Sequence, residues 1–184
     1  IYGIIGDNGS GKTVLLKLIC GFMKPDSGTV TVNGKVIGKD ADFPENTGII
    51  IEAPGFLPNY SGMKNLEYLA SIRGKIGKEQ IESAMKRVGL DPSSKLRVGK
   101  YALGMKQRLG IAQAIMEDQQ LLILDEPMNA LDKDAVEEMR KLFLSFKASG
   151  KTMLIVSHNE GDISTLCDEV YEFDGARIKR RENV

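Results

Sequence analysis

The stretch GDNGSGKT at residues 6–13 decides the fold of this chain. It fits the pattern G-x-x-x-x-G-K-[ST], and it lies between an apolar run at residues 1–5 and apolar side chains at helical spacing over residues 14–19. Glycines allow consecutive backbone N–H groups to converge on phosphate oxygens, and the helix that follows presents its positive end to them. The order of strand, glycine loop and helix therefore predicts a phosphate-binding loop.

We expect this loop to bind ATP together with Mg²⁺. The side chain of Lys12 would reach the β- and γ-phosphates, and the hydroxyl of Thr13 would bind Mg²⁺. The residues expected to contact the nucleotide from the loop are Asn8, Gly9, Ser10, Gly11, Lys12 and Thr13.

A second strand carries the acids that such a site needs. The wholly apolar run at residues 121–124 is followed directly by Asp125 and Glu126. We expect Asp125 to hold Mg²⁺, directly or through water, and Glu126 to polarise the attacking water as a general base. Taken alone, two acids after a buried strand are more often ordinary loop residues. Together with the phosphate-binding loop, they favour a hydrolytic site.

The remaining pattern predicts an α/β fold, a parallel sheet flanked by helices in the manner of P-loop NTPases. Short apolar strands alternate with amphipathic helices, which is typical of a parallel sheet covered on both faces. Further strands are expected at residues 48–51 and 152–156, hairpins at 29–37 and 170–179, and helices at 63–73, 78–88, 105–116 and 133–147. We expect residues 1–52 and 119–184 to form a nucleotide-binding core lobe, and residues 53–118 to form a small helical subdomain inserted between the phosphate-binding loop and the acidic strand.

Composition narrows the classes of function. The 184 residues carry 25 Lys and Arg against 25 Asp and Glu, so charge gives no reason to expect a nucleic-acid partner. No apolar stretch approaches the roughly 18 residues of a membrane span. Cys20 and Cys167 stand far apart, which favours two buried thiols over a disulfide framework or a zinc site. The chain starts at Ile1, inside a predicted strand, and we expect a further segment upstream.

Five separated motifs together resemble the ATP-binding cassette (ABC) family of transporter ATPases across nearly the whole chain. Besides the phosphate-binding loop and the acidic pair, the sequence YALGMKQR at residues 101–108 resembles the family signature, residues 129–132 resemble the D-loop, and Ser157 and His158 resemble the switch-histidine segment. Residues 48–52 stand in the place of the Q-loop. Alone, a histidine after a strand is more often a structural residue; the order of the motifs carries the resemblance.

The resemblance implies roles for further residues. In the family, two cassettes face each other head to tail and trap ATP between one phosphate-binding loop and the opposite signature helix. The implied catalytic residues are Glu126, His158 and Glu52, the implied metal ligands are Thr13, Asp125 and Glu52, and the implied nucleotide contacts beyond the loop are Ala102, Gly104 and Asp132. The implied partners are a second cassette and an integral membrane permease, which would place the chain in the cytoplasm at the inner face of the cell membrane.

Three departures from the family pattern modify these expectations. Ala102 stands where the family has serine, and the loss of one charge-assisted hydrogen bond, about 1.5 to 3 kcal/mol, should weaken activity without abolishing it. Glu52 stands where the family has glutamine; this replacement, within residues 52–59, resembles the branch that exports or confers immunity to peptide antibiotics such as bacitracin and lantibiotics. In that branch we expect Phe56 and Leu57 to lie near the groove for the membrane partner or to pack between the two lobes. The aromatic residue that stacks on adenine in the family would lie upstream of Ile1.

Three alternatives stay open. A GTPase or small-molecule kinase would share the phosphate-binding loop, but a guanine-reading Asn-Lys-x-Asp is not found in the sequence. A family ATPase that serves the ribosome or DNA, and does not drive transport, is the second alternative. The third is a weakly active module that only gates a partner; the presence of Lys12, Asp125, Glu126 and His158 together argues for hydrolysis.

Overall fold

A computed structural model describes residues 1–174 and 177–181, and within them six strands form one sheet in the order β4-β5-β6-β1-β7-β8. The strands are β1 (Tyr2–Gly6), β4 (Thr47–Ile50), β5 (Leu121–Asp125), β6 (Thr152–Val156), β7 (Glu169–Asp174) and β8 (Arg177–Arg180). All neighbours pair in parallel except β7 and β8, which are antiparallel. The predicted α/β class is confirmed, and β1 lies inside the sheet, so the loop that follows it opens at the carboxyl edge.

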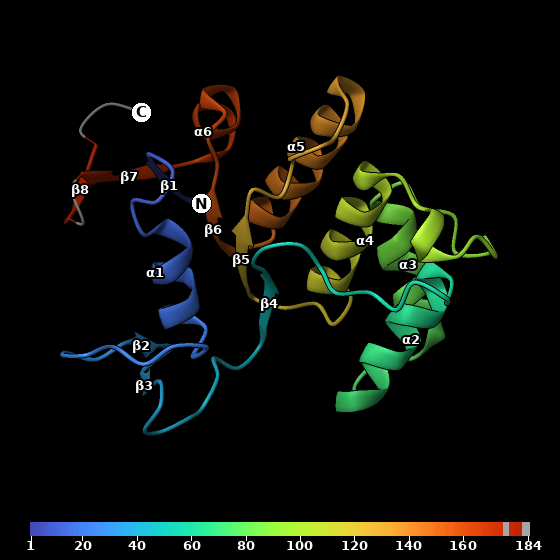
Figure 1. Cartoon of the computed structure of the whole chain (residues 1–184), viewed down its shortest axis with the longest axis horizontal. Helices are drawn as coiled ribbons and strands as arrows, with labels where there is room; N and C mark the ends of the chain where they lie inside the picture. Colours follow the sequence, from blue (N-terminus) through green and yellow to red (C-terminus); the bar gives the residue numbers. More distant parts are fainter. Residues whose placement is uncertain (175–176, 182–184) are drawn as a thin grey trace.

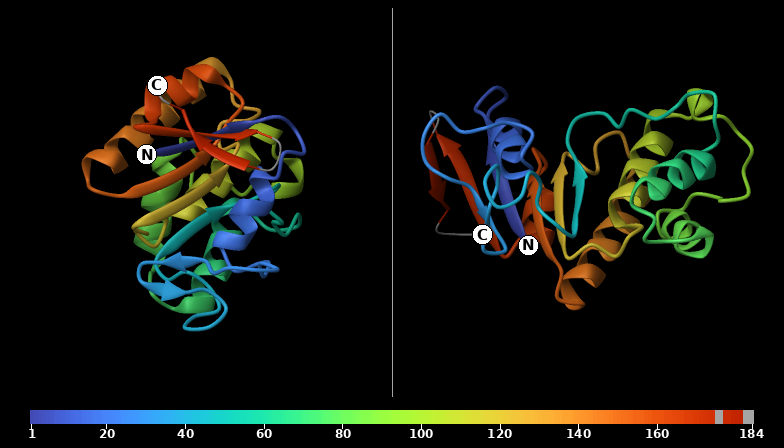
Figure 2. Two further views of the ribbon diagram at one scale, coloured as in Figure 1. Left: turned by 90° about the vertical axis from the view of Figure 1, so that its left-hand side faces the viewer. Right: turned by 90° about the horizontal axis from the view of Figure 1, so that it is seen from below.

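Helices cover both faces of this sheet. They are α1 (Lys12–Ile19), α2 (Gly62–Arg73), α3 (Lys78–Arg87), α4 (Leu103–Ile115), α5 (Lys133–Ala148) and α6 (Glu160–Leu166), with a 3₁₀ turn at Val98–Lys100. Figure 1 shows α1 on one side of the sheet and α5 on the other. The helices α2, α3 and α4 gather at one end of the molecule, beyond β4 (Figure 2). The lobe boundaries at residues 52 and 119 stay a prediction.

Side chains of β5 show why the sheet needs cover on both faces. Leu122 and Leu124 pack into a large core shared with α4 and α5, whereas Ile123 packs with Leu16 of α1 in a second core on the opposite face. Successive strand residues point to opposite faces, so a wholly apolar strand must be buried twice. The two cores fix α1, and with it the phosphate-binding loop, against the strand that carries Asp125.

A close backbone approach fixes the position of α4. Gly48 of β4 lies against the carbonyl of Ala114, and a Cβ at this position would stand 1.9 Å from that oxygen. Only glycine permits this packing, because real Cβ atoms do not approach oxygen so closely. Arg108 joins α4 to the end of α3 through a hydrogen bond of 2.7 Å from its guanidinium to the carbonyl of Val88. The signature segment at the start of α4 is therefore held by both the sheet and the helical group.

Most predicted elements are present with small shifts at their ends. The first hairpin consists of β2 (Thr31–Val32) and β3 (Lys35–Val36), and its turn residues Asn33 and Gly34 both have positive φ, as a type I′ turn requires. The pairing of β7 with β8 confirms the closing hairpin; of its predicted turn at residues 174–175, residue 175 lies outside the described residues. The sequence analysis did not predict α6.

Both cysteines are buried free thiols, as predicted. Burial raises the pKa of Cys20 to about 12 and that of Cys167 to about 11. Among the described helices, none combines the length and the apolar character that crossing a bilayer requires.

Candidate active site

The phosphate-binding loop closes around its own lysine. Gly11 precedes α1 with a φ of 106°, a left-handed conformation that glycine adopts without strain. Lys12 is only 7% exposed, and its Nζ donates hydrogen bonds to the carbonyls of Gly6 at 2.7 Å and Asp7 at 2.8 Å. An ammonium group has three N–H donors, so these two bonds leave one for a phosphate oxygen.

The two predicted metal ligands from distant segments meet at this loop. Thr13 Oγ1 donates a hydrogen bond of 2.8 Å to Asp125 Oδ2, which joins the first turn of α1 to the end of β5. Within the described part of the chain, no group of three or more His, Cys, Asp or Glu side chains could hold a metal ion. Mg²⁺ usually takes one or two carboxylates and completes its shell with waters and substrate phosphates. The Thr13 and Asp125 oxygens fit this mode of binding.

Glu126 has the environment of a general base. It has a φ of 46°, outside the usual range for a non-glycine residue, and its N–H donates to the carbonyl of Val156 across 3.0 Å. Its Oε1 is buried without a hydrogen-bond partner among residues 1–174 and 177–181, and burial raises the pKa of this carboxyl. His158 Nε2 lies 3.3 Å from Oε1 without the alignment of a hydrogen bond. The hydroxyl of Ser10 in the phosphate-binding loop is likewise buried and has no hydrogen-bond partner in the part of the chain that the structure describes.

These groups surround one cavity of about 510 Å³, a volume typical of small-molecule sites. Its lining includes most of the predicted residues, namely Asn8, Gly9, Gly11, Lys12, Thr13, Glu52, Asp125, Glu126 and His158. The sequence-predicted loop, acidic pair and histidine are therefore brought together at the carboxyl edge of the sheet.

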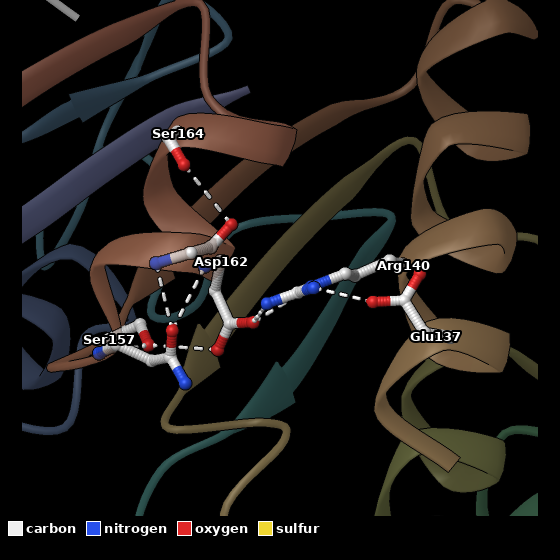
Figure 3. Close-up of polar contacts among 7 residues, drawn as sticks. Glu137, Arg140, Ser157, Asp162 and Ser164 are labelled. Carbon is white, nitrogen blue, oxygen red and sulfur yellow. Dashed lines mark hydrogen bonds and ion pairs between the residues drawn. The ribbon is translucent and has the colours of Figure 1, made fainter. Parts of the chain in front are cut away.

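A buried ion pair supports the histidine segment (Figure 3). Arg140 of α5 donates to Asp162 Oδ1 at 2.6 Å, and the two side chains are only 17% and 5% exposed. The other oxygen of Asp162 accepts a hydrogen bond from Ser157 Oγ at 3.3 Å, and this hydroxyl in turn accepts one from the N–H of Asn159 at 3.1 Å. Ser157 and Asn159 flank His158, so the network holds the backbone on both sides of it.

Glu52 lines the same cavity as the other predicted site residues, and its carboxylate forms an ion pair of 2.6 Å with Lys17 Nζ. Its backbone is left-handed, with a φ of 62°. Its predicted roles in metal binding and catalysis stay predictions.

Four predicted nucleotide contacts, Ser10, Ala102, Gly104 and Asp132, lie outside this cavity's lining. Ala102 and Gly104 stand at the start of α4, where Ala102 is the N-cap residue and no side chain caps the helix. The carboxylate of Asp132 caps α5 by accepting a hydrogen bond of 2.8 Å from the N–H of Ala135. Contacts of Ala102, Gly104 and Asp132 with nucleotide stay predictions that require a second cassette.

Some residues that shape the site were missed by the sequence analysis. Gln107 donates hydrogen bonds to the carbonyls of Glu126 and Pro127, at 3.1 and 2.9 Å, and so ties α4 to the acidic loop. Lys17 and Arg140 gave no signal because each reads as an ordinary charge on a helix. Asp162 did carry a sequence signal, because it stands three residues after Asn159, which is the spacing of an N-cap followed by an acid.

Comparison with known families agrees with this arrangement. The family described as ABC transporter matches residues 1–129, which include the phosphate-binding loop, the signature segment and both acids. This chain belongs to the ABC transporter family. The predicted enzyme class, an ATPase of that family, is confirmed.

Relatives of this ABC cassette include proteins named for bacitracin transport and for lantibiotic transport. It is 42% identical over 184 residues to the uncharacterized ABC transporter ATP-binding protein YybJ of Bacillus subtilis, covering 100% of this chain and 84% of YybJ. It is 42% identical over 172 residues to the bacitracin transport ATP-binding protein BcrA of Bacillus licheniformis, covering 92% of this chain but only 56% of BcrA. It is 34% identical to the lantibiotic transport ATP-binding protein SrtF of Streptococcus pyogenes, covering 99% of this chain and 79% of SrtF.

The fold of the ABC cassette also matches a solved structure. The dimeric structure of MJ0796, a bacterial ABC transporter cassette, has a TM-score of 0.85 over 100% of this chain and 86% of that one, at 20% identity. At this identity the match shows the fold, a P-loop NTPase sheet flanked by helices.

Proposed function

We propose that this cassette binds and hydrolyses Mg-ATP in order to drive a membrane transporter. One observation carries the proposal: the 2.8 Å contact between Thr13 and Asp125 stands in the same cavity as the buried, unpaired carboxylate oxygen of Glu126. A lysine held in the loop, a pair of hard oxygen ligands and a base with a raised pKa are the parts that phosphoryl transfer to water needs.

The residues divide the chemistry between them. The loop N–H groups and Lys12 bind the phosphates, and Thr13 and Asp125 hold Mg²⁺, which when bound neutralises charge on the phosphate oxygens. Glu126 accepts a proton from water as the water oxygen bonds to the γ-phosphorus; the bond from this phosphorus to the bridging oxygen breaks, and ADP leaves with its electrons. His158 stands beside Glu126 and binds the γ-phosphate.

We infer that a second cassette completes the site. The start of α4 has free N–H groups because no side chain caps it, and Leu103 in its first turn is 67% exposed. Helix N-termini favour anions. Ala102 and Gly104 are therefore proposed to contact the γ-phosphate bound by the partner copy, with Asp132 nearby.

The proposed membrane partner is a permease that docks on a groove between the sheet and the helical group. This groove has a volume of about 590 Å³, and its lining includes Phe56, Leu57, Tyr68 and Ile72. Tyr68 and Ile72 are 62% and 71% exposed, an apolar surface that a partner could bury. Docking there would place the cassette at the cytoplasmic face of a membrane.

The proposed substrate is a peptide antibiotic, moved in the direction of export or immunity. The support is the similarity to BcrA and SrtF, whose names state bacitracin and lantibiotic transport, together with Glu52 in the place of the family glutamine. Transport by the assembled complex should be lost with Glu52→Ala and retained with Glu52→Gln. Equal transport by both variants would contradict the role of this side chain.

The test of the ATPase is the variant Glu126→Gln in the longer natural chain. It should bind ATP, hydrolyse it about 10² to 10⁴ times more slowly, and form a dimer at saturating Mg-ATP, measured by size-exclusion chromatography with light scattering. Glu79→Gln, an exposed change on α3, is the control and should hydrolyse ATP at the wild-type rate. A monomer at saturating ATP would favour the gating module, and salt-dependent binding of RNA or DNA would favour a non-transport ATPase.

A further inference from the structure

We propose that Lys17 is a positioning residue that holds the carboxylate of Glu52 away from the phosphate and metal site until nucleotide binds. The inference rests on the proposed nucleotide site and assigns a partner to the residue that departs from the family pattern. The observation that supports it is the ion pair of 2.6 Å between Lys17 Nζ and Glu52 Oε1.

The geometry connects this pair to the metal ligands. Lys17 follows Thr13 by four residues on α1, and side chains at this spacing lie on the same helix face, about 6 Å apart along the axis. Thr13 points to Asp125, and Lys17 points to Glu52 two residues beyond the end of β4. The Glu52 carboxylate is therefore held about one helical turn from the metal site.

Charge explains why such a partner is needed here. Asp125 and Glu126 already place two carboxylates in the cavity, and Glu52, which lines the same cavity, adds a third. An unpaired third carboxylate would repel the phosphates of ATP, whereas a neutral glutamine would not. Lys17 neutralises Glu52 through the ion pair of 2.6 Å, so the loop receives the triphosphate without this repulsion.

The ion pair also lies where Glu52 can leave Lys17 for another positively charged partner. The Glu52 side chain is 64% exposed, so packing does not lock the carboxylate, whereas that of Lys17 is half-buried at 30% exposed. Breaking an exposed ion pair costs little, because water solvates both groups. Glu52 can thus leave Lys17 and approach the metal ligands once bound Mg²⁺ supplies a competing positive charge.

A double-mutant cycle tests the proposal by equilibrium binding. The four proteins are wild type, Lys17→Met, Glu52→Gln and the double variant, in the longer natural chain. Isothermal titration calorimetry with a non-hydrolysable ATP analogue gives its Kd in EDTA and in Mg²⁺ without turnover. We expect Lys17→Met to raise the ratio of the Kd in EDTA to the Kd in Mg²⁺ about fivefold, because the released carboxylate repels free ATP and favours the metal complex. In the Glu52→Gln background the same change should leave this ratio within about twofold.

Controls separate this effect from other consequences of losing a lysine. Lys35→Met breaks an ion pair of similar geometry, 2.9 Å to Glu45, far from the loop, and should not change the ratio. Thermal melting of each variant confirms folding before binding is compared. An equal change of the ratio in both Glu52 backgrounds overturns the role of Lys17 but leaves the nucleotide site standing. Failure of the wild type to bind ATP overturns the proposed function and this inference with it.

Discussion

Thr13 Oγ1 lies 2.8 Å from Asp125 Oδ2, although 112 residues separate them along the chain. The contact joins the helix that opens after β1 to the acid that ends β5, and it forms because both strands end at the same edge of a parallel sheet. Every function proposed for the cavity depends on this meeting of two oxygens.

Thr13→Val removes the hydroxyl and keeps the shape of the side chain. We expect the Kd of Mg-ATP to rise about tenfold, since roughly 1.4 kcal/mol of ligand and hydrogen-bond energy is lost, while binding of ATP in EDTA is unchanged. Calorimetry measures both constants. Thr13→Ser retains the oxygen and should bind as the wild type does; equal loss in Ser and Val would contradict the metal role.

Ala102→Ser tests the uncapped start of α4. A serine at an N-cap position should raise the free energy of unfolding by about 0.5 to 2 kcal/mol and offer the hydroxyl that the family places toward the partner's γ-phosphate. We therefore expect a higher Tm and a faster ATPase. Ala102→Val, which has no hydroxyl, is the control. A serine variant with an unchanged or lower rate would argue against a role for the missing oxygen.

Ser157→Ala tests the support of the histidine segment. It removes the hydroxyl between Asp162 and the N–H of Asn159 but leaves the ion pair of Asp162 with Arg140. We expect stability to fall by about 1 kcal/mol and kcat to fall severalfold at constant KM for ATP, because His158 loses its fixed backbone. Ser164→Ala, which removes a hydroxyl that donates to the carbonyl of Gly161 on the same helix at 3.3 Å, is the matched control. The same kcat for both variants would contradict the prediction.

Gly48→Ala tests the packing of α4 on β4. The added Cβ would stand 1.9 Å from the carbonyl oxygen of Ala114, so backbone must move. We expect a loss of about 1 to 3 kcal/mol or more in urea unfolding. Gly55→Ala adds the same methyl group where no atom lies within 4 Å, and it should cost far less.

Alkaline pH should destabilise the protein through its buried thiols. Burial raises the pKa of Cys20 to about 12, whereas an unfolded thiol ionises near 8.5, so between these values the unfolded state binds fewer protons and stability falls as pH rises. By pH 10 the loss from this thiol is about 2 kcal/mol. Urea unfolding of the wild type and of Cys20→Ala at pH 7.5 and pH 10 measures this loss. The free energy of unfolding of the wild type, relative to that of the variant, should fall by about 2 kcal/mol between the two pH values. A difference in free energy of unfolding that does not change with pH would contradict the raised pKa of Cys20.

The sequence predicts the parts of this molecule that follow from local pattern. The glycine loop, the apolar strand before Asp125 and the Asn33-Gly34 turn each carry their own signal, so the sheet and the centre of the site were predictable. Asp162 was missed although its spacing from Asn159 is a capping signal, because α6 spans only seven residues and includes a glycine, which weakens the helical pattern. The pairing of Lys17 with Glu52 joins two charges that look like any solvated side chains, and only the tertiary fold brings them together.

The nucleotide cavity and the groove proposed for the permease have two lining residues in common, Glu52 and Ala53. The peptide at residues 52–53 thus belongs to both surfaces. A permease that displaced this peptide from the groove would therefore also change the wall of the cavity in which ATP would be hydrolysed.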